Sequence, residues 1–245
     1  MTRPEPIRTA FILGAGLGRR LRPLTEKCPK PLLPAGGRPM IHYVMEHLRK
    51  AGVERFIINT HHCPEAYEKA FPDGRWRGVP VTLRYEPVLL DTGGGLKNIE
   101  DLLTCDKRLF VYNGKILTDL PLKPLIEAHE EGGSEVTLGL RSDGPLCNVS
   151  LDEWGAVRDL RHVLGRTGGR LCQFAGIYIA EKSFFRRLQA GRAESVVEAW
   201  LRVIQEGKGG IRGVVIDEGR WHNLGTIEEY ERIACSIQAP SEDLP

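Results

Sequence analysis

The sequence lacks the features of several specialised classes of protein. Its six cysteines lie far apart and include no Cys-x-x-Cys pair, so the spacing of a zinc site is missing and a disulfide framework has little support. No apolar run approaches the roughly 20 residues needed to cross a bilayer. The apolar stretch near the N-terminus is too short for a signal peptide, so we expect a cytoplasmic protein without a membrane partner.

A large excess of charge is missing as well. The 34 basic and 32 acidic residues leave a formal net charge of +2, and only 7% of the residues are aromatic. Without a strong basic excess or a stripe of basic and aromatic residues, a nucleic-acid partner is not expected. The sequence does not indicate an oligomeric state.

The length and the hydrophobic content favour one large domain. The chain has 245 residues, of which 41% are hydrophobic, and this is enough for a well-buried core. No repeat, low-complexity linker or shift in composition divides the chain. We therefore predict a single domain over residues 1–245, with about eight flexible residues at each end.

Short apolar segments alternate with amphipathic ones. Four segments of the first half are typical of buried parallel strands because they are short, apolar and β-branched: 9–13, 55–59, 81–85 and 109–112. The segment 38–53 repeats its apolar residues at helical spacing and stops at Gly52. This alternation predicts an α/β domain.

The second half continues the alternation. We predict strands at 135–140, 174–180 and 211–217, the last of which is the final strand, and a hairpin over 148–160. Helices are expected near 122–131, 182–188 and 194–205. Thr226 and Glu229 have the spacing of a capping box, which predicts a last helix that ends at about residue 237.

The segment after the first predicted strand carries the strongest chemical signal. GAGLG at 14–18 runs directly into five cations: Arg19, Arg20, Arg22, Lys27 and Lys30. A dinucleotide fingerprint would need a glycine at position 19, and the spacing of a Walker P-loop is absent too. A loop of backbone N–H donors followed by cations suits phosphate oxygens. The alternative is a surface loop of solvated cations, which we expect for Arg22 and Lys27.

Two adjacent stretches, GAGLGRRLRPLT at 14–25 and PKPLLPAGGRPMI at 29–41, resemble the signature of the sugar-1-phosphate nucleotidyltransferases, or NDP-sugar pyrophosphorylases. The similarity continues through INTHH (58–62), EPVLLDTGGGL (86–96), YNGKILTDL (112–120), FAGIY (174–178) and WHNLGT (221–226). The chain is most similar to the short uridylyl- and guanylyltransferases for sugar phosphates. The resemblance implies a Rossmann-like, doubly wound sheet that is mixed but mainly parallel and is flanked by helices.

The resemblance also implies a reaction, in which an NTP and a sugar 1-phosphate give an NDP-sugar and pyrophosphate with the help of Mg²⁺. Such a phosphoryl transfer depends on positioning and on charge neutralisation. Arg20 matches the family arginine that stabilises the leaving pyrophosphate. Lys30 matches the lysine that bridges the reacting phosphates.

Further residues receive binding roles from the same resemblance. The expected nucleotide contacts are Gly14, Ala15, Gly16, Gly18 and Arg19 in the first glycine loop, and Thr92, Gly93 and Gly94 in a second loop at 91–95. Glu86 precedes the second loop and is a candidate acceptor for a base N–H. Asn113 and Gly176 are expected beside the sugar.

Two positions depart from the family pattern. Lys115 stands where relatives have an aspartate that binds the catalytic Mg²⁺, and Asn223 stands at the second metal aspartate. An ammonium group cannot ligate a metal, and an amide oxygen is a weaker ligand than a carboxylate. These changes put the Mg²⁺ requirement in doubt.

Several alternatives remain open at these positions. Lys115 takes over part of the role of the metal as a catalytic residue, or the metal arrives with the NTP and is held by Asp119 or Asp217. Alternatively, the chain is a catalytically impaired homologue that binds nucleotide or sugar phosphate. A cytidylyltransferase for another phosphorylated alcohol is a further alternative. The base and the sugar are not determined by the sequence.

Overall fold

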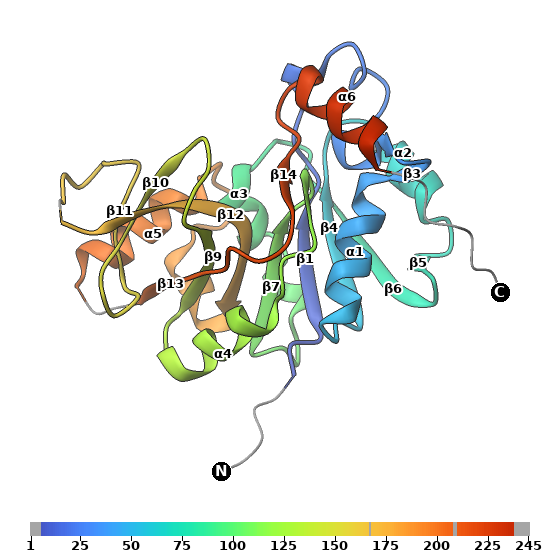
Figure 1. Cartoon of the computed structure of the whole chain (residues 1–245). Helices are drawn as coiled ribbons and strands as arrows, with labels where there is room; N and C mark the ends of the chain where they lie inside the picture. The colour runs from blue at the N-terminus through green and yellow to red at the C-terminus, as the bar shows by residue number, and fades with distance from the viewer. Residues whose placement is uncertain (1–5, 167, 208–209, 238–245) are drawn as a thin grey trace.

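A computed structural model describes residues 6–166, 168–207 and 210–237 of the chain. A ten-stranded mixed sheet runs through these residues, and helices lie on both of its faces (Figure 1). Apart from residues 6–8, the ends that the sequence predicts to be flexible lie outside the described residues.

Parallel strands form the first half of the sheet. β1 (Thr9–Leu13) lies between β4 (Arg55–Thr60) and β7 (Arg108–Asn113) and is parallel to both. β6 (Val79–Tyr85) continues in parallel beyond β4, and β5 (Arg75–Trp76) closes that edge in the antiparallel direction. Because helices cover both faces, the central strands β1, β4 and β7 are buried over most of their length. The four strands predicted in this half are confirmed.

The second half of the sheet is mainly antiparallel. β12 (Arg170–Glu181) pairs with β7, with β9 (Val136–Arg141) and with β10 (Cys147–Leu151), always antiparallel. β10 and β11 (Val157–Leu160) form the predicted hairpin. β13 (Ile211–Val215) is parallel to β9. The predicted mixed, mainly parallel sheet flanked by helices is confirmed, and most of its parallel pairs lie in the half that begins the chain.

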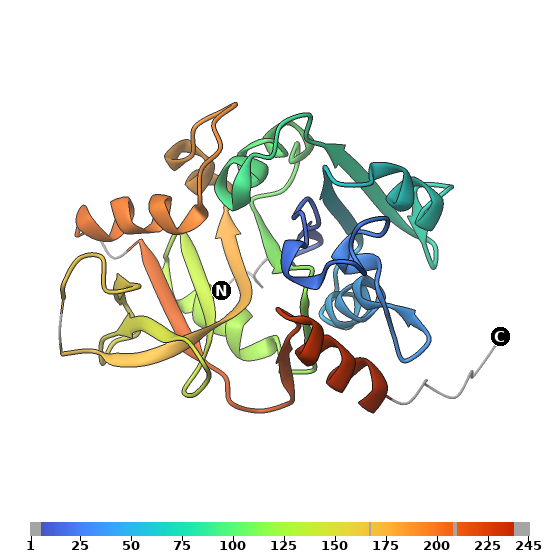
Figure 2. The same ribbon diagram turned by 90° about the horizontal axis from the view of Figure 1, so that it is seen from above.

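Helices pack two hydrophobic cores against the faces of the sheet. α1 (Met40–Lys50) and α4 (Lys123–Gly132) cover one face, while α3 (Asp91–Lys97) and α5 (Val196–Gln205) cover the other (Figure 2). The helical stripe predicted for α1 is buried throughout: Met40, Ile41, Val44, Met45 and Leu48. The apolar spacing in this segment therefore identified the face that meets the core.

A third, smaller core lies between residues 21–40 and the C-terminal segment. α6 (Ile227–Ser236) packs over the short strand β2 (Pro34–Ala35), which pairs with β3 (Arg38–Pro39). The predicted capping box is present, because the Thr226 hydroxyl accepts from the Glu229 N–H and the Glu229 carboxylate accepts from the Thr226 N–H. β8 (Ile116–Thr118) pairs with β14 (Trp221–Asn223), which brings the C-terminal segment against residues that follow β7.

Several sequence predictions need correction. The segment 211–217 is not the last strand, because β14 follows it, and residues 91–97 form α3 rather than a loop. The segment near 182–188 is a 3₁₀ helix, η4 (Lys182–Arg187), and α2 (Pro64–Ala70) and η3 (Glu100–Leu102) were not predicted. These elements are short, so their periodicity carries little signal. No helix in the described part of the chain is long and apolar enough to span a bilayer.

Candidate functional site

A cavity of about 630 Å³ opens at the carboxyl ends of β1 and β7. The final residues of these two strands, Leu13 and Asn113, line it. The order of the strands reverses here, since β4 and β6 lie on one side of β1 and β7 lies on the other. Open α/β sheets bind ligands at this switch point, outside the carboxyl ends of the strands.

Many of the predicted site residues meet in this cavity. Its lining includes Gly14, Ala15, Gly16, Gly18, Arg19, Arg20, Lys30, Thr92, Asn113 and Lys115. Six other predicted residues and one of the metal positions do not line it: Glu86, Gly93, Gly94, Asp119, Gly176, Asp217 and Asn223. The two glycine segments therefore converge on one cavity, which the first reaches through four of its residues and the second through Asp91 and Thr92.

The glycine turn at 14–18 is held from below by Asn59, the second-last residue of β4. The Asn59 Oδ1 accepts from the N–H groups of Gly14 at 2.7 Å and Ala15 at 3.4 Å. The Tyr67 hydroxyl donates to the Gly14 carbonyl at 3.0 Å. The Gly14 N–H is thus committed to the fold, and the donors that face a ligand must come from later residues of the turn.

Only glycine fits at position 14. A Cβ there would lie 2.6 Å from the Asn59 carbonyl oxygen and 2.8 Å from the Tyr67 hydroxyl, whereas a Cβ at Gly16 would meet nothing within 4 Å. Gly18 has the left-handed backbone conformation, with φ of 61°, and its carbonyl accepts from the Thr25 hydroxyl at 2.8 Å. Gly14 therefore serves the packing of the turn against β4, and Gly16 leaves room on the side of the cavity.

Asn59 was not singled out from the sequence, although the INTHH segment that contains it was. The Asn59 amide also donates to the Glu86 carboxylate at 2.7 Å. A buried side chain that satisfies three polar groups is costly to remove, because each group then loses its partner. Its position at the end of a buried strand was the available signal.

Replacement of Asn59 by alanine should lower the free energy of unfolding by about 2–4 kcal/mol, because Gly14 and Glu86 would keep buried polar groups without partners. Urea unfolding followed by circular dichroism measures this. Asn148→Ala, at a half-buried position, is the control, and we expect a change below ~1 kcal/mol there. Equal losses in the two variants would contradict the assigned role of Asn59.

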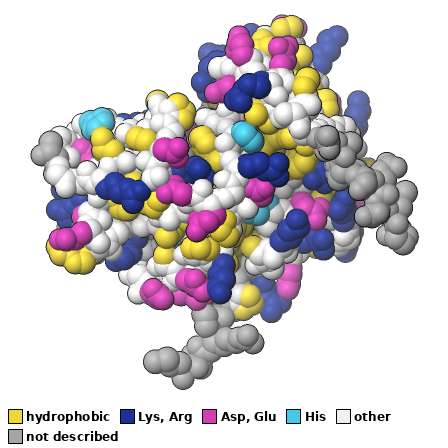
Figure 3. All heavy atoms as spheres, viewed as in Figure 1, with side chains coloured by type: hydrophobic (Ala, Val, Ile, Leu, Met, Phe, Trp, Pro, Cys, Tyr) yellow, Lys and Arg dark blue, Asp and Glu magenta, His cyan; other side chains and the backbone are white. Residues whose placement is uncertain are grey.

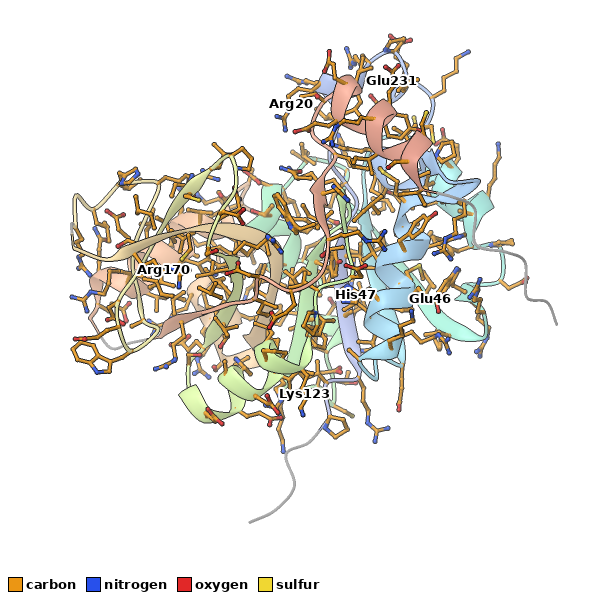
Figure 4. The ribbon with its side chains drawn as sticks, in the orientation of Figure 1. Arg20, Glu46, His47, Lys123, Arg170 and Glu231 are labelled. Carbon is orange, nitrogen blue, oxygen red and sulfur yellow. The ribbon has the colours of Figure 1, made fainter. Side chains whose placement is uncertain are left out.

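Positive charge is concentrated in the cavity. Its lining carries Arg19, Arg20, Lys30 and Lys115, and the only carboxylate among the described lining residues is Asp91. On the outer face that Figure 3 shows, basic and acidic side chains are interspersed. Figure 4 shows Arg20 beside the start of α6, and the Arg20 guanidinium lies near Gly225 in the same region. The cavity is thus suited to a ligand with several negative charges.

The two lysines are strongly affected by their surroundings. Burial lowers the pKa of Lys30 to about 7, and repulsion from Lys115 and Arg20 adds to this effect. Burial also lowers the pKa of Lys115, with repulsion from Arg20 as the next cause. Glu229 opposes both shifts, but its carboxylate already accepts from the N–H groups of Gly225 and Thr226. The lysines therefore lack a strong internal counter-charge.

Short segments of irregular structure position these lysines and Arg20: two 3₁₀ helices, one of them rich in proline, and a turn. Lys30 begins the 3₁₀ helix η2 (Lys30–Leu32) after Pro29 and is 8% exposed, and Arg20 lies in η1 (Arg19–Leu21). Lys115 lies in the turn between β7 and β8. Arg22 and Lys27 are exposed and do not line the cavity, as the sequence analysis expected of solvated cations.

The second glycine segment is packed against the protein's own backbone at Gly93 and Gly94. The N–H groups of Gly93 and Gly94 donate to the Glu194 carbonyl at 2.8 and 3.1 Å. A Cβ at Gly94 would lie 2.2 Å from the Arg192 carbonyl oxygen. These glycines allow α3 to approach the segment before α5, so their close neighbour is the protein's own backbone.

Glu86 lies beneath this region, fully buried. One oxygen of its carboxylate accepts from Asn59 and the other accepts from the Leu90 N–H at 3.0 Å. Glu86 thus connects the Asn59 support to the segment that leads into α3. The cavity itself is lined on this side by Leu89, Asp91, Thr92 and Ala193.

The predicted sugar side is only partly exposed to the cavity. Asn113 lines it, whereas Gly176 lies behind Asn113 with φ of 84°. A Cβ at Gly176 would be 2.7 Å from the Ile116 side chain and 3.1 Å from the Asn113 Nδ2. Gly176 therefore permits β12 to pack closely against the residues that follow β7.

The residues at the expected metal positions do not fit a metal centre. Lys115 supplies a cation, and the Asn223 Oδ1 is buried without a hydrogen-bond partner. Asp119 is paired with Arg220 at 2.8 Å, and Asp217 accepts from the Ser142 N–H at 2.8 Å. Within the described ranges, no group of three or more His, Cys, Asp or Glu side chains is placed to hold a metal ion.

Comparisons with known proteins agree with this geometry. The family model described as "Nucleotidyl transferase" matches residues 9–146. A mannose-1-phosphate guanylyltransferase of Mycobacterium tuberculosis strain H37Rv is 32% identical over 233 residues, which are 93% of this chain and 64% of that protein. A D-glycero-alpha-D-manno-heptose 1-phosphate guanylyltransferase of Aneurinibacillus thermoaerophilus is 30% identical, over 72% of this chain and 76% of that protein.

A solved structure shares the fold. HddC from Yersinia pseudotuberculosis, complexed with GMP-PN, has a TM-score of 0.75 and 22% identity, covering 93% of this chain and 98% of that one. The chain spans 64% of the length of the mycobacterial relative, so it matches part of that protein. On the match of the family model and the similarity to these relatives, the chain belongs to the nucleotidyl transferase family, within its sugar-1-phosphate nucleotidyltransferases.

Proposed function

We propose that this chain joins an NTP to a sugar 1-phosphate and releases pyrophosphate. The observation that carries the proposal is the cavity at the switch point of the sheet, where four cationic side chains face one carboxylate. The two relatives described above are named guanylyltransferases for a mannose and a heptose 1-phosphate. We therefore propose GTP as the nucleotide and a hexose or heptose 1-phosphate as the acceptor.

The reaction needs no base from the protein. A sugar 1-phosphate is already a dianion at neutral pH, so its oxygen attacks the α-phosphorus of the NTP directly. The bond from the α-phosphorus to the bridging oxygen breaks, and its electron pair leaves with pyrophosphate. The protein's share is to hold the two phosphates in line and to neutralise charge.

The cavity supplies these two needs. Lys30 begins η2 after Pro29 and lines the same cavity as the glycine turn and Lys115, and it is proposed to contact both reacting phosphates. Arg20 is more exposed, at the outer side beside Gly225, and is proposed to stabilise the leaving pyrophosphate. Gly16 and Gly18 leave the backbone of the turn open to the nucleotide. We propose the cytoplasm as the site of action, where NTPs are available.

Pyrophosphate release tests the proposal. The purified chain is mixed with each of the four NTPs and a panel of sugar 1-phosphates, and release is followed by a coupled phosphate assay after pyrophosphatase treatment. We expect turnover that requires both substrates and is fastest with GTP. Absence of both turnover and nucleotide binding, in a protein that melts cooperatively, would refute the proposal.

A non-catalytic role is the second candidate. The observation that favours it is the lack of a carboxylate cluster for a metal ion among the described residues. In that case the chain would bind an NTP or a sugar phosphate in calorimetry, yet release no pyrophosphate with any pair of substrates. The buried position of Lys30 and the half-buried position of Lys115 in the cavity argue for catalysis, because a simple binding site would not need two partly desolvated cations.

Nucleotide binding should take up protons above pH 7. The pKa of Lys30 is lowered to about 7 by burial, by Lys115 and by Arg20, and a bound triphosphate would raise it again. Between about pH 7 and pH 10, Lys30 is then mostly neutral in the free site and protonated in the complex, so the affinity falls as the pH rises through this window.

Calorimetry at pH 8 measures this uptake, with buffers that differ in ionisation enthalpy. Lys30→Arg is the control, because an arginine stays protonated and should take up less. An affinity that increases from pH 7 to pH 9 would contradict the expectation.

A further inference from the structure

The charges in the cavity suggest a specific form of the nucleotide. We propose that the substrate is the metal-free NTP, and that Lys115, together with Lys30 and Arg20, neutralises the phosphates in place of a divalent cation. The inference rests on the proposed function and deepens it. It predicts a nucleotidyl transfer that continues when divalent cations are removed.

The charge count of the cavity supports this form. With Lys30 protonated, as it is proposed to be in the nucleotide complex, the four cations Arg19, Arg20, Lys30 and Lys115 and the carboxylate of Asp91 give the described lining a net charge of +3. A metal-free NTP carries a charge near 4− above neutral pH, whereas its Mg²⁺ complex carries 2−. A bound metal-free NTP therefore brings the sum to 1−, so that each cation of the lining meets phosphate charge, whereas the Mg²⁺ complex brings it to 1+ and leaves the buried Lys30 and the half-buried Lys115 incompletely neutralised.

Lys115 is held where a charge is needed. The N–H of its neighbour Gly114 donates to the Leu13 carbonyl at 3.2 Å, and the Leu224 N–H donates to the Lys115 carbonyl at 3.2 Å. A Cβ at Gly114 would lie 2.8 Å from the Leu13 carbonyl oxygen and 3.1 Å from the Pro31 ring. The turn is thus packed tightly against β1 and against the segment that contains Lys30, so both lysines enter one cavity from neighbouring segments.

The oxygen atoms that remain nearby suit donors. The Asn223 side chain lies on β14, opposite Ile116 in the pairing with β8, and its Oδ1 is buried without a partner. A neutral amide oxygen accepts from a hydroxyl or an ammonium group, but it does not offset the charge of a divalent cation. Asp119, the nearest carboxylate in sequence to Lys115, is held by Arg220.

The reaction balances without a metal ion. An NTP of charge 4− and a sugar 1-phosphate of charge 2− give an NDP-sugar of 2− and pyrophosphate of 4−, so the total stays at 6−. The new bond uses an electron pair of the attacking phosphate oxygen, and the pair of the broken bond leaves on pyrophosphate, which then takes a proton from water. The developing negative charge on the pyrophosphate lies in the field of the three cations.

Binding without turnover gives the first test. The imido analogues of the four NTPs are titrated into the full chain by calorimetry, once in EDTA and once in Mg²⁺. A Mg²⁺ concentration of about 5 mM keeps the nucleotide in its metal complex. We expect an affinity in EDTA at least equal to that in Mg²⁺. We expect Lys115→Met to weaken the EDTA affinity about tenfold or more, and Lys27→Met, an exposed cation outside the cavity, to change it less than twofold.

Turnover gives the second test, with pyrophosphate release measured in EDTA. The parent should keep its rate, Lys115→Met should lose about 10²–10³-fold in EDTA, and Lys115→Asp should recover activity only with Mg²⁺. Binding or turnover of the parent that occurs only with Mg²⁺ would overturn this inference and leave the proposed function intact. If none of the four analogues binds, either in EDTA or in Mg²⁺, the proposed function itself is refuted. Thermal melts of each variant confirm that a loss does not come from unfolding, and Lys115→Gln replaces any variant that does not fold.

Discussion

Replacement of Lys30 by methionine is expected to reduce kcat by about 10²–10³-fold, which corresponds to about 3–4 kcal/mol of transition-state stabilisation. Lys30 is 8% exposed in the cavity, and its nearest charged groups are Lys115, Arg20 and Glu229. Methionine fills a similar volume but carries no charge, so the change removes the interaction with phosphate and keeps most of the packing. Steady-state pyrophosphate release with saturating substrates measures the effect.

The same substitution should raise stability at pH 6.5. Because the folded protein lowers the pKa of Lys30, the charged lysine destabilises the folded state below about pH 7, and this cost disappears as the pH rises toward the ordinary value of lysine. A melting temperature higher by a few degrees at pH 6.5, and nearly unchanged above pH 10, would separate a catalytic role from a structural one.

The matched control for Lys30 is Lys27. Both lysines lie in the same proline-rich segment, but Lys27 is exposed and does not line the cavity. Lys27→Met should change kcat by less than about twofold and leave the melting temperature unchanged. The catalytic role of Lys30 would be refuted if the two variants had the same kcat.

Replacement of Gly14 by alanine should disrupt the glycine turn at 14–18 and also lower the stability of the whole protein. The new Cβ would lie 2.6 Å from the Asn59 carbonyl oxygen, 2.8 Å from the Tyr67 hydroxyl and 2.9 Å from the Ile58 side chain. Overpacking against backbone typically costs about 1–3 kcal/mol, and here the displaced turn also loses its hydrogen bonds to Asn59. At the upper end this lowers the melting temperature by about 6–12 °C for a protein of this size.

Gly16→Ala is the control in the same turn. A Cβ at Gly16 meets nothing within 4 Å, and Gly16 is not among the residues with positive φ, so the melting temperature should stay within about 2 °C of the parent. Because Gly16 lines the cavity, this variant can still weaken nucleotide binding. Equal melting temperatures for Gly14→Ala and Gly16→Ala would show that the support of the turn by Asn59 contributes little.

The strand and helix pattern was predictable where a segment is long or strongly apolar. β1, β4 and α1 were found from their apolar spacing, and the capping box at Thr226 marked the start of α6. The sequence analysis missed α2, α3 and β14. These elements are short and depend on contacts with distant segments, such as β14 on β8, so their local pattern is weak.

The site was predictable in its first loop and less so in its second. Arg20, Lys30 and Lys115 do line one cavity. Gly93 and Gly94 do not, because their N–H groups donate to the Glu194 carbonyl. A glycine pattern indicates that something approaches the backbone closely, but it does not say whether a ligand or another part of the chain does so. The hydrogen bond between Asn59 and Glu86 could not be predicted from the sequence either, because it requires β4 and β6 to be adjacent.

By itself, the sequence determined the α/β class, the position of the glycine turn at 14–18 and the chemistry of the cations that follow it, because these depend on periodicity and on residue type over short distances. Only the tertiary structure decided that Lys115 joins Lys30 in one cavity, that Asp119 is held by Arg220, and that the second glycine segment packs against the protein. Burial and charge repulsion arise between segments far apart in the chain, so the lowered pKa of Lys30 exists only in the folded protein.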